Sequence, residues 1–284
     1  YIRAYLRPDG FAPLIGDTDS GQVLPFVRRT ADDHAYLLEI GAAVLDDPTL
    51  KSQCTTSQAF PQAGTYIMRH GDLYLCFNAS DAGLNGRGSH GHNDALSIEV
   101  SAGGRAFIVD PGTYVYSADL QKRHEFRSTA YHSTVQIDGR EQNTTDLHTP
   151  FVIGNEAKPR VLEWKTSDDS DKVVAEHYGY PVVHRRTVVF NKRERAWVID
   201  DEFFGDGEHV YEVRFHFAPG LDVKVRERVV EASGLTVSAL STDVQPVLES
   251  QPVSRDYGEM QDAVAACWRI SGRPGKLSWE IKSA

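Results

Sequence analysis

Hydrophobic positions follow a helical period only near the N-terminus of the chain. Residues 32–45, DDHAYLLEIGAAVL, place apolar side chains at intervals of three and four, which predicts an amphipathic helix. Asp32 or Asp33 would begin this helix, and Asp46-Asp47-Pro48 would end it. A single helix cannot bury its own apolar face. It must therefore lie on the following domain or be the remnant of a helical domain.

From about Phe60 onward the apolar positions alternate, which is the period of β-strands. A hairpin is predicted at 65–77, turning at Gly71-Asp72, and a second one at 95–109. Further strands are predicted at 134–137, 161–165, 172–176, 182–190, 196–200, 210–217, 223–225, 229–231, 235–239, 263–270 and 277–281. Many short strands separated by turn residues are typical of an antiparallel β-sandwich or barrel. The expected organisation is a loop and helix over 1–57, followed by a mainly β domain over 58–284.

The net charge of the chain restricts the kinds of molecule that it could bind. The net charge of −10 argues against nucleic-acid binding, which needs a basic footprint. An acidic polymer could bind only at a local basic pocket, which Arg87, Arg123, His124, Arg127 and Arg140 could supply.

Other features of the composition say less. The three cysteines form no CxxC pair, and no stretch approaches the roughly 20 apolar residues of a membrane span. Tyr1 opens no signal peptide, so we expect a processed form or part of a longer protein.

The segment Ser89 to Asp94, SHGHND, concentrates the candidate chemistry. His90 and His92 are two apart, so both imidazoles can face one side of an extended chain. Asp110 ends a strand before a Pro-Gly turn, and His132 precedes another strand. Two histidines and one carboxylate from three strand ends would make a zinc site with an open fourth position. The alternative is that these are hydrogen-bonded polar residues and turn caps.

The histidines need not share one role. If His92 binds metal, His90 remains available for acid–base work or for a substrate carboxylate. Asn93 could fix an imidazole tautomer as a hydrogen-bond partner of a metal ligand. For Asp94 we favour plain turn chemistry.

Arginine and tyrosine side chains downstream could bind a substrate. A helical turn at 123–127 would place Arg123 and Arg127 on one face, where they could clamp a uronate carboxylate. The alternative there is a solvated, salt-bridged loop. Tyr114 and Tyr116 could stack on sugar rings or simply pack, and His184 or Arg186 could line the cavity. No GxSxG, P-loop, Rossmann or HExxH motif is present, which removes the usual nucleotide and serine-hydrolase interpretations.

Three segments carry a resemblance to a known family: GSHGHNDALSIEV, GGRAFIVDPGTYVY and RSTAYHSTVQIDGREQ. In order and spacing they resemble the heparinase II/III-like polysaccharide lyases, from about Gly88 to Gln142. RPDGFAPLIGDTD, VVHRRTVVFN and HVYEVRFHFAPG extend the resemblance over most of the chain.

The resemblance implies a fold and a reaction. Family members have an N-terminal (α/α) toroid and a C-terminal antiparallel β-sandwich, so this chain would be the end of the toroid plus the whole sandwich. His92, Asp110 and His132 match the ligands of a zinc ion that is mainly structural, and His90 matches a catalytic or carboxylate-contacting histidine. The implied reaction is β-elimination in a polysaccharide containing uronic acid, such as a glycosaminoglycan. The implied location is the bacterial periplasm, the cell envelope or the exterior.

The family's catalytic tyrosine lies on the toroid, which residues 1–57 are too short to hold. That role is not transferred to Tyr114, Tyr116 or Tyr131, and we expect the 284 residues alone to show little lyase activity. Two other classes stay open: a non-catalytic carbohydrate-binding module, and a free-standing metal-dependent hydrolase.

Overall fold

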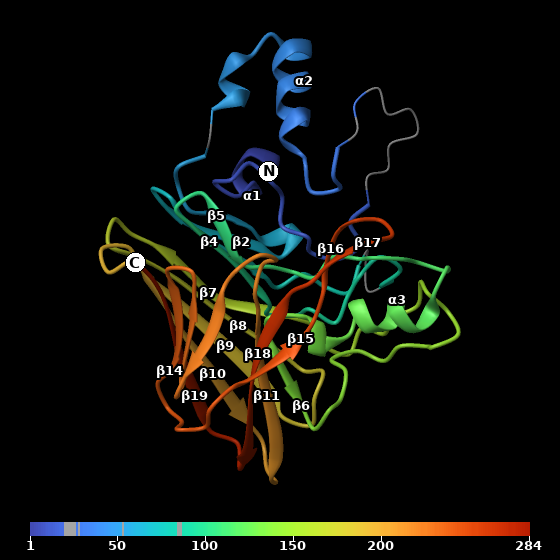
Figure 1. Cartoon of the computed structure of the whole chain (residues 1–284), viewed down its shortest axis with the longest axis vertical. Coiled ribbons are helices and arrows are strands. Elements are labelled where there is room, and N and C mark those ends of the chain that lie inside the picture. The colour runs from blue at the N-terminus through green and yellow to red at the C-terminus, as the bar shows by residue number, and fades with distance from the viewer. Residues whose placement is uncertain (20–26, 28, 53, 84–86) are drawn as a thin grey trace.

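The computed structural model describes residues 1–19, 27, 29–52, 54–83 and 87–284, and it is mainly β. Its strands form a five-stranded sheet in the order β1-β2-β3-β4-β5 and an eight-stranded sheet in the order β12-β13-β14-β19-β10-β9-β8-β7. A four-stranded sheet, β15-β18-β11-β6, and the hairpin β16-β17 complete the β-structure of the described residues (Figure 1). Every pairing between these strands is antiparallel.

The elements have the following bounds. The helices are α1 Ile2–Tyr5, α2 Ala35–Leu45, η1 Pro48–Lys51, η2 Pro61–Ala63, α3 Leu120–Phe126 and η3 Thr129–Tyr131. The strands of the first half are β1 Gln58–Phe60, β2 Thr65–His70, β3 Leu73–Asn78, β4 Ile98–Ala102, β5 Arg105–Ile108, β6 Val135–Ile137, β7 Arg160–Thr166, β8 Ser170–His177 and β9 Val183–Asn191. The remaining strands are β10 Ala196–Phe204, β11 His209–His216, β12 Val223–Arg226, β13 Val229–Ala232, β14 Leu235–Ala239, β15 Val247–Ser250, β16 Val253–Asp256, β17 Glu259–Gln261, β18 Val264–Gly272 and β19 Lys276–Ser283.

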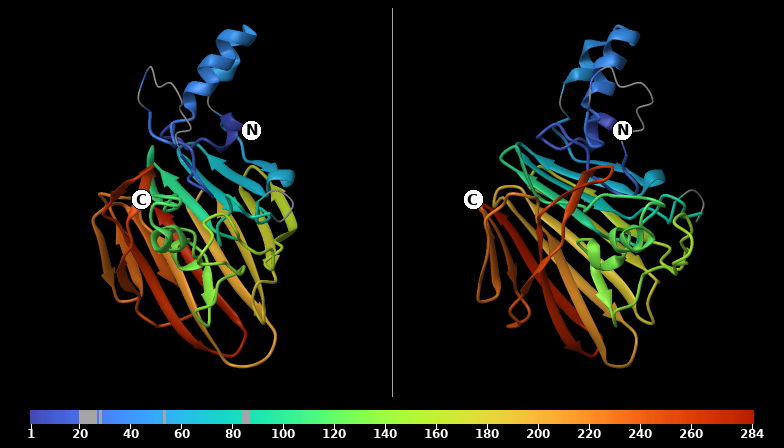
Figure 2. Two further views of the ribbon diagram at one scale, coloured as in Figure 1. Left: turned by 90° about the vertical axis from the view of Figure 1, so that its right-hand side faces the viewer. Right: turned by 45° about the vertical axis from the view of Figure 1, so that its right-hand side comes forward.

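One hydrophobic core joins the three larger sheets into a sandwich. The five- and four-stranded sheets meet at an antiparallel bridge between Ile108 and Phe217. Alternate side chains of β9 are buried, as a sheet packed on one face requires. Trp197, Trp268 and Trp279 are fully buried between the layers. The antiparallel sandwich expected from the alternating pattern is therefore confirmed (Figure 2).

The helix predicted over 32–45 is observed as α2, but it begins at Ala35 with His34 as its N-cap. Asp32 does not cap the helix, because its buried carboxylate accepts a 2.7 Å hydrogen bond from Arg255. The helix projects from one end of the sandwich, and it leaves Ile40, Val44 and Leu45 more than half exposed (Figure 1). At 11 residues, α2 is too short to cross a membrane, and the same holds for every helix within the described ranges.

The loop between the two N-terminal helices is fastened to the five-stranded sheet by buried polar contacts. Arg7 donates to Glu99 on β4 at 3.1 Å, and the second oxygen of Glu99 accepts from the backbone N–H of Leu14 at 2.8 Å. The same oxygen accepts from the backbone N–H of Asp110 at 3.1 Å. Glu99 therefore links residues 7–14 to the strand end that carries Asp110.

Candidate metal centre and the adjoining histidine

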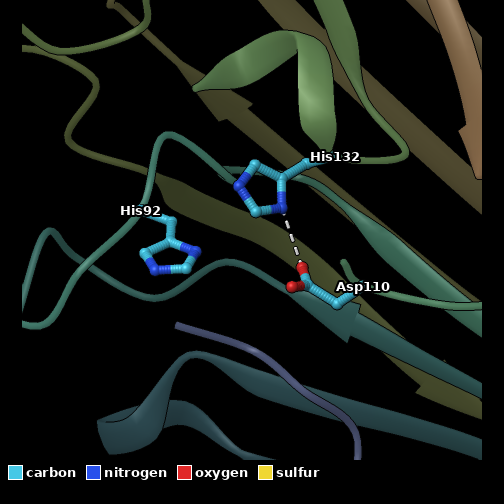
Figure 3. A group of neighbouring side chains, drawn as sticks. All are labelled: His92, Asp110 and His132. Carbon is cyan, nitrogen blue, oxygen red and sulfur yellow. Dashed lines mark hydrogen bonds and ion pairs between the residues drawn. The ribbon is translucent and has the colours of Figure 1, made fainter. Parts of the chain in front are cut away.

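His92, Asp110 and His132 come together from three separate parts of the chain (Figure 3). His92 lies in the loop before β4, Asp110 follows β5, and His132 ends η3. Each residue offers a ligand atom within 4.8 Å of the others, and all three are buried. Gly112 permits the turn after Asp110, since its φ is +76° and a Cβ there would lie 2.1 Å from the carbonyl oxygen of Ser254.

Hydrogen bonds account for only one nitrogen of each imidazole. His132 Nδ1 is 2.8 Å from Asp110 Oδ2, and His92 Nε2 is 2.8 Å from a carboxylate oxygen of Asp17. Within the described part of the chain, His92 Nδ1 and His132 Nε2 are buried with no hydrogen-bond partner. Buried polar atoms are nearly always paired, so the cluster keeps hydrogen-bonding or metal-binding capacity that its own contacts do not use. Two imidazoles and one carboxylate form a donor set that suits zinc.

The pKa values of His92 and His132 are shifted in opposite directions. Burial lowers the pKa of His92 to about 4, although Asp17 opposes the shift, so His92 is neutral as a metal ligand must be. Burial would also lower the pKa of His132, but the adjacent Asp110 carboxylate outweighs it and the pKa is raised. A metal bound there would compete with this proton.

Asp17 was not singled out from the sequence, yet it joins both histidines of SHGHND. Its Oδ1 lies 2.8 Å from His92 Nε2, and its Oδ2 lies 2.9 Å from His90 Nδ1. Arg123 donates to both oxygens, at 2.8 Å to Oδ2. Burial works against the carboxylate, but the hydrogen bonds from His92 and Arg123 hold the pKa of Asp17 well below its usual range. The only signal in the sequence was the Asp-containing loop of RPDGFAPLIGDTD.

His90 is placed differently from His92. Its side chain is 65% exposed, and it lines two adjoining pockets of about 510 and 480 Å³. The contact between His90 Nδ1 and the Asp17 carboxylate fixes the tautomer and the ring orientation of His90. Carboxylates of Asp17, Asp19, Asp81 and Asp94 line the two pockets, whereas Lys and Arg are missing from the described residues there.

The arginines expected to clamp a substrate carboxylate are buried. Arg123 and Arg127 are four apart on α3 and its C-cap, as the spacing predicted, but both are 0% exposed. Arg123 donates to Asp17 and to the carbonyl of Pro150, and Arg127 donates to the carbonyls of Pro150 and Gly88. Helical spacing placed them on one face, and packing turned that face inward. Arg123 and Arg127 are therefore not placed to clamp a substrate carboxylate at the surface. Arg87, three residues before His90, is exposed.

Asn93 also differs from the expectation that it holds an imidazole. Its side chain donates to Glu141 at 2.9 Å and accepts from the backbone N–H of Asn143 at 2.9 Å, so it ties two loops together. Asp94 is buried near Asp110 and His132, and burial raises its pKa to about 7.

His184 and Arg186 do not line the His90 pockets but are fully buried in the sandwich, where both bind Asp201. Arg186 also donates at 2.8 Å to the carbonyls of Leu96 and Ser133. It therefore holds the segments that carry His92 and His132 against each other.

An antiparallel β-sandwich with a buried His-Asp-His cluster beside an exposed histidine defines the architectural class of this chain. Residues 53–272 match the model of the family described as heparinase II/III-like, C-terminal. The chain belongs to this family, and the fold and the SHGHND segment fall within the matched region.

Individual relatives agree with that assignment. The chain is 29% identical over 152 residues to the heparin-sulfate lyase of Pedobacter heparinus, covering 51% of this chain and 21% of the relative. It is 27% identical over 172 residues to the heparin-sulfate lyase of Bacteroides thetaiotaomicron, covering 57% of this chain and 23% of the relative.

Solved structures share the fold. The crystal structure of heparan sulfate lyase HepC from Pedobacter heparinus superimposes with a TM-score of 0.77 at 20% identity, covering 98% of this chain and 45% of that one. A crystal structure of heparinase III gives a TM-score of 0.81 at 16% identity, covering 100% of this chain and 47% of that one. The chain thus spans about half the length of these structures.

Proposed function

We propose that the chain is the sandwich portion of a polysaccharide lyase that cleaves uronic-acid-containing polysaccharides by β-elimination. The observation that carries the proposal is the position of His90, which is exposed in a pocket and held by Asp17 within the region matched to the family. The two curated relatives are heparin-sulfate lyases, so a heparan sulfate type of glycosaminoglycan is the first polymer to test.

The proposed reaction breaks a carbon–oxygen bond of the polymer. A base removes the proton from the carbon next to the uronate carboxylate, the electron pair forms a carbon–carbon double bond, and the glycosidic oxygen leaves and is protonated. His90 is the residue of this chain that we assign to the reacting sugar, as the base or as the donor that neutralises the carboxylate. Neutralisation matters because it lowers the barrier to the carbanion. Asp17 and Arg123 act through His90 by fixing its orientation.

His92, Asp110 and His132 would hold zinc, each through one ligand atom. A bound zinc ion would cross-link three loop segments and so stabilise this wall of the site. The ligand atoms are buried and His90 is exposed, which favours a structural ion over the metal centre of a free-standing hydrolase.

We infer that an (α/α) toroid of the same protein supplies the opposite wall. The exposed apolar side chains of α2 and the partial coverage of the solved relatives support this arrangement. Arg87 remains a candidate contact for substrate. A periplasmic, secreted or envelope location would fit a polysaccharide substrate of this kind.

The test is the absorbance of the unsaturated uronate released from heparan sulfate and from other uronate polymers. The complete gene product should release it, and the His90→Ala variant should not, while the variant keeps its thermal midpoint. A His90→Ala variant with full activity would remove the residue from the reaction. Absence of unsaturated product on every uronate polymer tried would overturn the lyase proposal and leave the carbohydrate-binding module.

A further inference from the structure

Tyr116, Phe151 and Tyr257 form a cluster of aromatic rings beside His90, which we call the aromatic platform. The ring centre of Tyr116 lies 5.3 Å from that of Phe151 and 5.4 Å from that of Tyr257. The His90 ring lies 5.6 Å from Phe151 and 6.2 Å from Tyr116. The three rings come from separate segments: the loop after β5, the loop before β7 and the turn of the β16-β17 hairpin.

The platform is not part of the hydrophobic core. Phe151 is 39% exposed and Tyr257 is 43% exposed, and the core clusters of the described residues include none of the three rings. Contiguous exposed apolar rings are costly in water and typically mark a ligand-binding surface. Their neighbour His90 and the 510 Å³ pocket, which Tyr116 also lines, make the platform continuous with the proposed site.

Contacts with Arg123 and Asp19, and one hydrogen bond within the platform, hold its rings in place. The buried guanidinium of Arg123 lies 5.2 Å from the centre of the Tyr116 ring and 5.8 Å from that of Phe151. The Tyr116 hydroxyl donates to Asp19 at 2.6 Å, and the Tyr116 backbone N–H donates to the Tyr257 hydroxyl at 3.2 Å. A surface already ordered in this way binds a ligand with little loss of side-chain entropy.

The β16-β17 hairpin brings Tyr257 to this place. Its Arg255 is paired with Asp32 at 2.7 Å, and the backbone N–H of Gly258 donates to the carbonyl of Tyr114 at 2.8 Å. Figure 1 shows the hairpin at the end of the sandwich nearest the N-terminal helices. The hairpin is therefore anchored on both sides of the ring that it presents.

We propose that the aromatic platform stacks against a pyranose ring of the polysaccharide, one binding subsite away from the sugar at His90. The proposal rests on the proposed function, since the occupant is the polymer that passes His90. A pyranose offers an apolar C–H face to flat rings and hydroxyls at its edge, and the platform offers both an aromatic surface and the Asp19 carboxylate. Because carboxylates line the adjoining pocket without Lys or Arg among its described residues, the subsite suits a ring face without a sulfate or carboxylate turned toward it.

The test measures binding of a short heparan sulfate oligosaccharide to the 284-residue chain by titration calorimetry. Tyr257→Ala and Phe151→Ala should each weaken binding by roughly threefold to tenfold, the loss expected for one aromatic stacking contact. Tyr257→Phe should bind more tightly than Tyr257→Ala, because it keeps the ring and loses only the hydroxyl that accepts from the Tyr116 backbone N–H. Phe204→Ala is the matched control, since Phe204 is 44% exposed on the eight-stranded sheet, and it should leave binding unchanged. All four variants should keep the wild-type thermal midpoint.

Wild-type affinity in both platform variants would overturn the proposal, as would equal loss in the Phe204→Ala control or no binding by the wild-type chain. The lyase proposal is read separately from unsaturated product. If the enzyme forms product and the platform variants bind as wild type, the platform proposal is refuted and the lyase proposal is supported. If those variants lose binding and the enzyme forms no product, the platform proposal is supported and the lyase proposal is refuted. In an active enzyme, the platform variants should raise KM and leave kcat near the wild-type value.

Discussion

Asp17 and His92, 75 residues apart in sequence, are joined by a 2.8 Å hydrogen bond between Oδ1 and Nε2. The other oxygen of Asp17 orients His90, so one buried carboxylate connects the candidate metal ligand with the candidate catalytic residue. Its charge is compensated by Arg123, which packs behind it. This relationship makes Asp17 the residue on which both proposed roles depend.

Asp17→Asn should therefore reduce stability and turnover together. The amide cannot accept from two imidazoles and a guanidinium, and the buried Arg123 loses its counter-charge, which typically costs about 3–5 kcal/mol for a broken buried pair. Urea unfolding and the elimination assay measure the two effects. Asp169→Asn is the control, because its pair with Arg193 lies at the surface and should matter little. Wild-type values of both quantities in Asp17→Asn would contradict the assignment.

His92→Ala and His90→Ala should separate metal binding from turnover. Removing His92 deletes a ligand, so zinc content and the thermal midpoint should both fall. Removing the exposed His90 should leave both quantities near the wild-type values and abolish elimination. Metal analysis of the purified variants, together with thermal unfolding, measures this division. Equal zinc loss in the two variants would refute it.

Chelation should lower the thermal midpoint of the wild-type chain, and added zinc should restore it. The reason is that an ion bound only by the folded state stabilises that state by mass action. His132→Ala is the matched control, since it should start at the lower midpoint and respond to neither treatment. A wild-type midpoint that chelation does not change would show that the His-Asp-His cluster needs no metal for stability.

Acid should destabilise the sandwich from about pH 6.5 downward. Burial lowers the pKa of His177 and of His184 below the ordinary 6.5. Below that pH both histidines are therefore protonated more fully in the unfolded chain than in the folded chain. More protons on the unfolded state mean that stability falls as the pH falls, by up to about 1.4 kcal/mol per pH unit for each histidine. Urea unfolding across pH 5 to 8 measures the slope, and His177→Phe should reduce it. An unchanged slope in that variant would exclude His177 as a contributor.

Much of the fold followed from the sequence because burial is periodic. The alternation at 182–190 and 196–200 predicted β9 and β10, and the three-four spacing at 32–45 predicted α2. The hairpin β16-β17 was not predicted, because VSRDYGEMQ has no clear alternation. It is held by distant contacts such as Arg255 with Asp32, not by a local pattern.

The sequence by itself determined which residue types stand near the site, since SHGHND, the Asp110 turn and the His132 segment are local motifs. Only the tertiary structure decided their partners. Asp17 reaches His90 and His92 from 73 and 75 residues away, and no local spacing encodes that distance. Helical spacing put Arg123 and Arg127 on one face, but packing alone decided that this face is buried. Short-range patterns fix which side chains share a face, whereas the burial of that face depends on contacts made across the whole chain.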